Sequence, residues 1–181
     1  MDHFNQNRPL VLFFDVNETL LDLEPLRRGI DEVLLEKGSS KLWFTTLLQY
    51  SLVLTVSGKY EPFIDIGVAI LTMMARNRDI VLSTENAREA LQPMLTLAPH
   101  HDVIDGLTHL KNAGFRIAAL TNSSSAACKI QMENAQLTNL FECQLSVDTL
   151  TKYKPHADIY RWASSEMNVS EADCMLVAAH A

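Results

Sequence analysis

A carboxylate, an amide and a hydroxyl follow one another at the end of an apolar run near the N-terminus. The run LVLFF at 10–14 leads directly into Asp15, and Asn17 and Thr19 come two and four residues later. An aspartate can attack carbon or phosphorus and form an ester intermediate, and a nearby hydroxyl can hold its second oxygen. The same residues can also form an ordinary turn after a strand, where Asp and Asn are common.

Two more polar groups occupy comparable positions later in the chain. Thr121 and Asn122 end a second apolar run, and Lys154 precedes a proline. Alone, the first pair can belong to a helix N-cap and the lysine to a solvated loop. Together with Asp15 they make coherent chemistry, because a lysine keeps a neighbouring carboxylate ionised. The N–H groups at the start of the helix after Asn122 can also bind an anion, so we expect these residues to converge at one site.

Four apolar segments predict the strands that would position these groups. Segments 10–15 and 116–122 are continuously apolar, which is typical of strands buried on both faces of a parallel sheet. Shorter apolar segments follow at 141–147 and 174–179, separated by helical patterns. This alternation predicts an α/β fold with a Rossmann-like parallel sheet. Ligands of such sheets bind beyond the carboxyl ends of the strands, where the polar residues lie.

The region between the first two strands is predicted to be helical. Helical patterns begin near Glu24, Ser40, Glu61 and Ser83, and no convincing strand pattern occurs before about Leu97. Such a long helical insert is typical of a second domain. We predict a core formed by 1–21 and 98–181 and an inserted helical cap formed by 22–97.

One segment of the predicted cap requires a membrane test. Segment 42–58, LWFTTLLQYSLVLTVSG, is 17 residues long and uncharged, which is the short limit for a membrane span. Its glutamine, threonines and serines favour a buried helix of a soluble protein, so we expect no membrane association. An apolar cap is compatible with a homodimer.

Composition excludes several classes of protein. Of the 181 residues, 48% are hydrophobic and the formal charge is −7, which favours a folded domain and argues against a nucleic-acid binder. Three widely spaced cysteines and a polar N-terminus favour a cytoplasmic protein with neither a disulfide framework nor a zinc site. The run His100, His101, Asp102 suggests a metal site, but neighbouring side chains of an extended run point apart, so we expect loop histidines.

The motifs together resemble the haloacid dehalogenase superfamily over essentially the whole chain. FFDVNETLLD is similar to its first motif, ALTNSS to its second, TKYKPHADIY to its third, and the helical insert to its cap. Segment 42–63 and the run LSVD are similar to the type II 2-haloacid dehalogenase branch. That resemblance implies displacement of halide from C2 of a small 2-haloalkanoic acid by a carboxylate, then hydrolysis of the ester. It implies no metal and no organic cofactor.

The resemblance also implies roles for individual residues. Asp15 would be the nucleophile, with the hydroxyls of Thr19 and Thr121 supporting it. Phosphatases of the superfamily carry a second aspartate where this chain has Asn17, which suggests a leaving group that needs no proton. Asn122 would line the halide pocket, and Lys154 would form an ion pair with Asp15. Tyr160 would contact either the substrate or Lys154.

Three departures from the branch concern the substrate pocket and the end of the chain. Phe44 stands where the branch has an arginine after its cap tryptophan, and Arg27 or Arg28 can substitute for it. Ala178 and His180 replace a serine and an asparagine, and His180 can be a tail residue or orient water. Members of the family continue beyond this point with an aspartate, a helix and a strand, so we expect either a fragment or a truncated product with poor stability and slow hydrolysis of the ester.

Two other functions stay open at this stage. One is a phosphatase of the same fold, against which Asn17 and the missing aspartate argue. The other is a binding protein or a catalytically impaired homologue, which Phe44 and the end of the chain favour. Halide release and phosphate release, measured side by side, separate these functions.

Overall fold

The core is a four-stranded parallel sheet, described in a computed structural model for residues 8–179. The strands are β1 (Val11–Phe14), β2 (Arg116–Thr121), β3 (Cys143–Ser146) and β4 (Cys174–Val177), in the spatial order β3-β2-β1-β4. All four residues of β1 are buried, because β1 pairs with β2 on one side and β4 on the other. The predicted α/β fold with a parallel sheet is confirmed.

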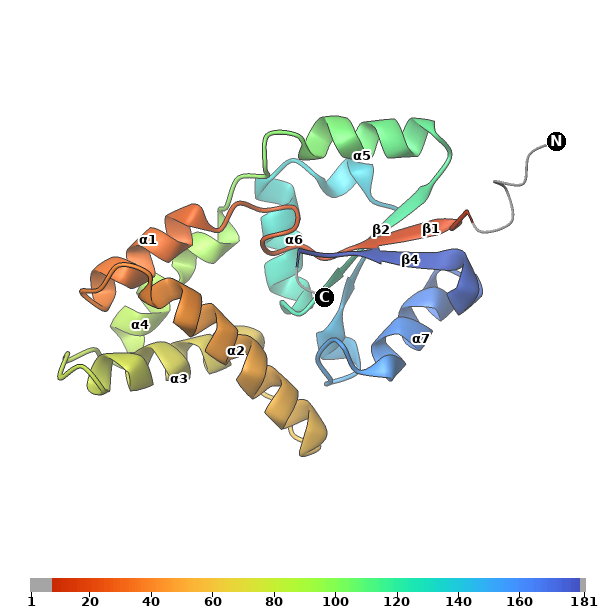
Figure 1. Cartoon of the computed structure of the whole chain (residues 1–181). Helices are drawn as coiled ribbons and strands as arrows, with labels where there is room; N and C mark the ends of the chain where they lie inside the picture. The colour runs from red at the N-terminus through yellow and green to blue at the C-terminus, as the bar shows by residue number, and fades with distance from the viewer. Residues whose placement is uncertain (1–7, 180–181) are drawn as a thin grey trace.

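Helices cover both faces of this sheet. They are α5 (Val103–Asn112), α6 (Ser125–Asn134) and α7 (Ala157–Glu166). α5 lies on one face and α7 on the opposite face (Figure 1). Ser124 caps α6 by accepting a hydrogen bond from the Ala127 N–H, as a serine at this position commonly does. Short 3₁₀ helices complete the core at Thr138–Leu140, Val147–Thr149 and Glu171–Asp173.

The inserted cap is entirely helical among the described residues. It contains α1 (Glu24–Val33), α2 (Ser39–Val56), α3 (Phe63–Arg76), α4 (Thr84–Ala90) and a 3₁₀ helix, η1 (Gln92–Leu95). The four α-helices gather beyond the carboxyl ends of the strands (Figure 1). The Asp22 N–H donates to the Ala98 carbonyl, so the chain leaves and re-enters the core at adjacent points. This pairing supports the proposed cap boundaries at 22 and 97.

Helix α2 is only partly buried, which corrects the prediction of a buried helix. Trp43, Leu47 and Ser51 face the cap interior, whereas Val53 and Val56 are exposed. The difference arises because α1 and α3 pack against one side of α2 and leave the other side to solvent. Among residues 8–179, none of the helices has the length and apolar character that crossing a membrane requires.

Candidate active site

Asp15 lies directly after the central strand and carries two oriented hydrogen bonds. Its Oδ1 accepts from Lys154 Nζ at 2.7 Å, and its Oδ2 accepts from the Thr19 hydroxyl at 3.1 Å. The backbone N–H of Asp15 donates to Val177 in β4, which fixes the strand end. The side chains of Asp15 and Lys154 are 18% and 11% exposed, so the ion pair is partly shielded from water but open to a ligand. A carboxylate held at both oxygens is aimed in one direction.

Lys154 is held in place at both ends of its side chain. Its Nζ also donates to the Leu120 carbonyl at 2.6 Å, and its backbone N–H donates to Asn122 Oδ1 at 3.1 Å. Asn122 therefore links the end of β2 to the lysine loop. These contacts join three segments that are far apart in sequence but meet at the carboxyl edge of the sheet, as expected for a parallel sheet.

Asn17 belongs to a buried polar network. Its Nδ2 donates to Ser123 Oγ, and its Oδ1 accepts from Gln131 Nε2, both at 2.9 Å. Gln131 Nε2 also donates to the Met94 carbonyl at 2.8 Å, which connects the network to the cap. Asn17 borders the cavity at Asp15, but its amide is committed to holding the loop. Asn17 therefore positions this loop, and a contact with substrate from its place at the cavity stays a prediction.

Thr121 and the start of α6 form hydrogen bonds with other groups of the protein. The Thr121 hydroxyl accepts from the Ser123 N–H at 3.1 Å, and within residues 8–179 it makes no hydrogen bond to Asp15, contrary to the prediction. The Asp148 carboxylate accepts from the Ser125 N–H and hydroxyl, at 2.7 and 2.8 Å. These bonds lower the pKa of Asp148, although burial raises it. The start of α6 thus binds a carboxylate of the protein.

A cavity of about 260 Å³ opens at Asp15, between core and cap. Tyr160 is half-buried on its wall, and burial, together with the negative charge of Asp15, raises the pKa of its hydroxyl. Tyr160 therefore stays neutral at physiological pH. Most other walls are apolar, so a ligand here would be largely removed from water. They include Phe44, Leu48, Leu52, Phe63, Pro155 and Leu176, with Asn122, Ser51 and Ala178 beside them.

Of the other residues that the sequence singled out, some line the cavity and others lie elsewhere. Phe44 lines the cavity, as its position in the cap helix predicted. Arg27, on the first cap helix, forms an ion pair with Glu18. Neither Arg27 nor Arg28 borders the cavity. Lys154 is the one cation among the described lining residues. His180 lies outside the described residues.

Sequence reasoning missed Tyr153, which joins the core to the cap. Tyr153 is fully buried and stacks on Tyr60, with ring centroids 5.3 Å apart. Its hydroxyl donates to the Glu61 carbonyl, and its backbone N–H donates to the Thr55 hydroxyl at 3.0 Å. Because Tyr153 directly precedes Lys154, it fixes the loop that carries Lys154 against the cap. An aromatic residue beside a candidate lysine was the only signal available.

We expect Tyr153→Ala to destabilise the fold. Loss of a buried aromatic side chain costs about 3–5 kcal/mol, whereas Tyr153→Phe, which removes only the hydrogen bond to the Glu61 carbonyl, should cost about 0.5–1.5 kcal/mol. Urea unfolding measures both changes. Tyr50→Ala is the matched control, because Tyr50 is 45% exposed on α2. Equal losses of stability at the two tyrosines would contradict the role of Tyr153.

The histidines and cysteines of residues 8–179 form neither a metal site nor a reactive thiol. Within residues 8–179, no three His, Cys, Asp or Glu side chains are grouped so that they can hold a metal ion. His100 instead contacts the Glu18 carbonyl through Nε2 at 3.1 Å. The three cysteines are free thiols, and burial raises the pKa of Cys128 to about 12. Burial also raises the pKa of Cys143 and Cys174, so all three are weak nucleophiles near neutral pH.

Known proteins are similar to this chain over nearly its whole length. The family model described as haloacid dehalogenase-like hydrolase matches residues 12–178. An (S)-2-haloacid dehalogenase of Pseudomonas sp. (strain YL) is 27% identical over 93% of this chain and 73% of its own length. A phosphoglycolate phosphatase of Colwellia psychrerythraea (strain 34H / ATCC BAA-681) is 25% identical over 92% of this chain and 74% of its own.

Structural comparison gives the same result. The crystal structure of a dehalogenase with an intermediate complex superposes with a TM-score of 0.86 and 25% sequence identity, covering 96% of this chain and 78% of the other. The chain belongs to the haloacid dehalogenase-like hydrolase family. The predicted resemblance is thereby confirmed, and the fold and relatives support a hydrolase.

Proposed function

We propose that this protein displaces halide from small 2-haloalkanoic acids through an ester on Asp15. The observation that carries the proposal is the Asp15 carboxylate, bound by Lys154 on one oxygen and by Thr19 on the other, at the wall of a largely apolar cavity. An apolar site strips water from the carboxylate and from the alkyl halide. The (S)-2-haloacid dehalogenase relatives support this substrate class.

The first step forms a carbon–oxygen bond and breaks a carbon–halogen bond. An Asp15 oxygen attacks C2 of the acid, and halide leaves from the opposite side with the bonding electron pair, so the configuration at C2 inverts. The attacking group is a carboxylate, and no proton moves in this step. Asn122 supplies an amide donor for the departing halide, its Oδ1 being engaged by the Lys154 N–H.

The second step returns Asp15 to its carboxylate form. A water molecule attacks the ester carbonyl of Asp15, the bond between that carbonyl carbon and the oxygen attached to C2 breaks, and a 2-hydroxy acid leaves. Lys154 and Thr19 stabilise the negative charge that develops on the aspartyl oxygens, a role that oriented donors fill in acyl transfer. The water oxygen stays on Asp15, one water proton goes to the departing oxygen on C2, and the other proton goes to solvent.

Asn17 argues against the main alternative, a phosphatase. A phosphate ester requires a proton donor for its leaving alcohol, and an amide cannot donate and recover a proton at neutral pH. Both ends of the Asn17 amide are also occupied by Ser123 and Gln131. The similarity to a phosphoglycolate phosphatase nevertheless makes this the second candidate function.

A paired assay tests the proposal. Purified protein is incubated with 2-chloropropionate while halide is measured, and separately with p-nitrophenyl phosphate and Mg²⁺ while phosphate is measured. We expect halide release at a rate above that of Asp15→Asn, and no phosphate release that depends on Asp15. Asp15-dependent phosphate release would establish the phosphatase. Failure of both reactions would support a catalytically impaired homologue. The presence of Phe44 in place of the arginine of the branch would agree with that outcome.

A further inference from the structure

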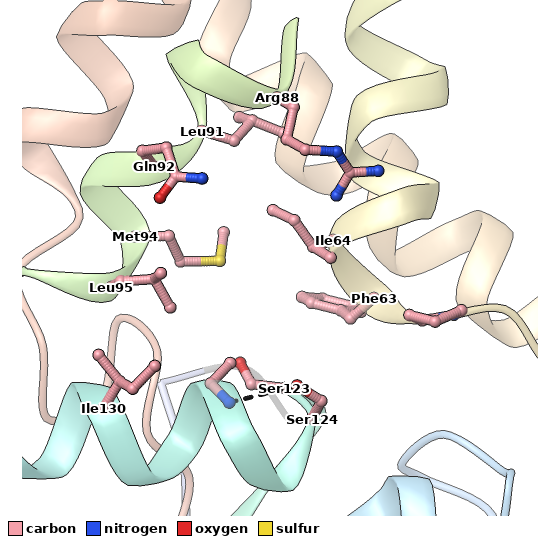
Figure 2. Close-up of a pocket in the computed structure, with 12 residues that line it drawn as sticks. Phe63, Ile64, Arg88, Leu91, Gln92, Met94, Leu95, Ser123, Ser124 and Ile130 are labelled. Atoms are coloured by element: carbon pink, nitrogen blue, oxygen red, sulfur yellow. Dashed lines mark hydrogen bonds between the residues drawn. The ribbon is translucent and has the colours of Figure 1, made fainter. Parts of the chain in front are cut away.

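A second apolar cavity lies between the cap and the core. It holds about 230 Å³ and is bounded by the α3 start, α4, η1 and the start of α6 (Figure 2). Most of its wall is aliphatic or aromatic, and no step of the proposed reaction uses it. Its main lining residues are Phe63, Ile64, Leu91, Met94, Leu95 and Ile130.

Phe63 is the apolar side chain shared by the two cavities. It borders both the cavity that contains Asp15 and the second cavity. In Figure 2 its ring extends from α3 toward the turn at Ser123 and Ser124. That turn continues from Asn122, which lines the first cavity. Phe63 therefore contributes to the wall of both spaces, and the residues that follow β2 border them as well.

The ring is held firmly in this position. Phe63 is 4% exposed and lies 5.7 Å from the Tyr153 ring, measured between centroids. Tyr153 in turn stacks on Tyr60 and binds the Glu61 carbonyl, so the phenyl group is part of a packed aromatic cluster. A ring fixed in this way acts as a wall rather than as a gate.

We propose that Phe63 determines the chain length of the acid that the enzyme accepts, by closing off the second cavity. This inference rests on the proposed function. Small-molecule sites usually measure about 300–1,000 Å³; each cavity alone is smaller, and the two joined would fall within that range. With Phe63 in place, an alkyl group on C2 has only the first cavity. Without the ring, the alkyl chain can extend along Ile64, Leu91 and Met94.

The test is a series of 2-bromoalkanoic acids from 2-bromopropionate to 2-bromooctanoate. In the native protein kcat/KM should fall for the longer acids. In Phe63→Ala the ratio of kcat/KM for 2-bromohexanoate to that for 2-bromobutyrate should rise roughly tenfold, because each buried methylene contributes about fourfold. If Phe63→Ala does not fold, Phe63→Leu should give a smaller change in the same direction. An unchanged ratio in a folded variant would overturn the proposal.

Two further variants show where the chain goes. Ala127 borders only the second cavity, so adding Ala127→Phe to Phe63→Ala should fill that cavity and remove the gain for long acids. Ile64→Ala enlarges the second cavity without opening the wall and should leave chain-length preference unchanged. A gain that persists in the double variant would show that the chain does not enter the second cavity.

A binding measurement separates this inference from the proposed reaction. Octanoate cannot react, yet it should raise the melting temperature of Phe63→Ala more than that of the native protein, because a ligand that binds only the folded state stabilises it. Propionate should show no such difference. Halide release from 2-bromopropionate by the native protein tests the reaction itself. A preference for octanoate that is equal in both proteins would overturn the role of Phe63 even if the reaction is confirmed.

Discussion

Asp15→Asn should abolish halide release from 2-haloalkanoic acids. An amide oxygen cannot displace halide at a useful rate, so the variant loses the group that forms the new bond. General acid–base contributions alone are worth about 10²–10⁴ in rate, and loss of a nucleophile should cost at least that much. The substitution preserves the shape of the side chain, which accepts from Lys154 and Thr19 in the native protein.

Asp105→Asn is the matched control for this result. Asp105 is an exposed carboxylate on α5 and does not border the Asp15 cavity. The same chemical change there should leave the rate unaltered. Circular dichroism establishes that both variants fold. Native rates in a folded Asp15→Asn variant would refute the assignment of the nucleophile.

Lys154→Met should reduce turnover roughly 10²- to 10³-fold, the typical cost of removing one oriented donor from an active site. The substitution retains much of the length of the side chain but removes the charge that contacts Asp15 and the Leu120 carbonyl.

Lys152→Met is the control for the lysine, because it lies two residues earlier in the same loop. Lys152 forms an ion pair with Asp158 at 2.5 Å, and both side chains are about two-fifths exposed. Surface pairs of this kind contribute about 0–1 kcal/mol, so turnover should be nearly native. If both lysine variants behave alike, Lys154 has no role beyond that of a loop charge.

The elements around Asp15 were predictable because the local sequence pattern and the packing of the fold favour the same structure there. A short, continuously apolar run is typical of a strand buried on both faces, and the structure places this run in β1, between β2 and β4. Parallel topology then brings Asn122 and Lys154 to the same edge as Asp15, although they are far apart in sequence. The start of a helix near Ser83 was also predictable, and in the structure the Ser83 hydroxyl caps α4 by accepting from the Asn86 N–H.

Other features depend on contacts that no local pattern encodes. The partner of Asn17 is Gln131, on a helix that periodicity alone assigns to the core without any function. Tyr153 is buried by residues of the cap rather than by its neighbours in sequence. For α2, a lack of charge suggested burial, but the number of helices packed against it decides how much is covered. Among residues 8–179, the Thr121 hydroxyl accepts a hydrogen bond from the Ser123 N–H, rather than forming one with Asp15.

The most direct test of the central claim is the fate of solvent oxygen in a single turnover. Protein in excess over 2-chloropropionate is allowed to react in ¹⁸O-labelled water, and the peptide that contains Asp15 and the product acid are examined by mass spectrometry. If Asp15 attacks C2 and water then attacks the aspartyl ester, ¹⁸O enters Asp15 and the lactate formed carries an unlabelled hydroxyl oxygen. Label in the lactate hydroxyl and none in Asp15 would show that water attacks the substrate directly, and would contradict the account.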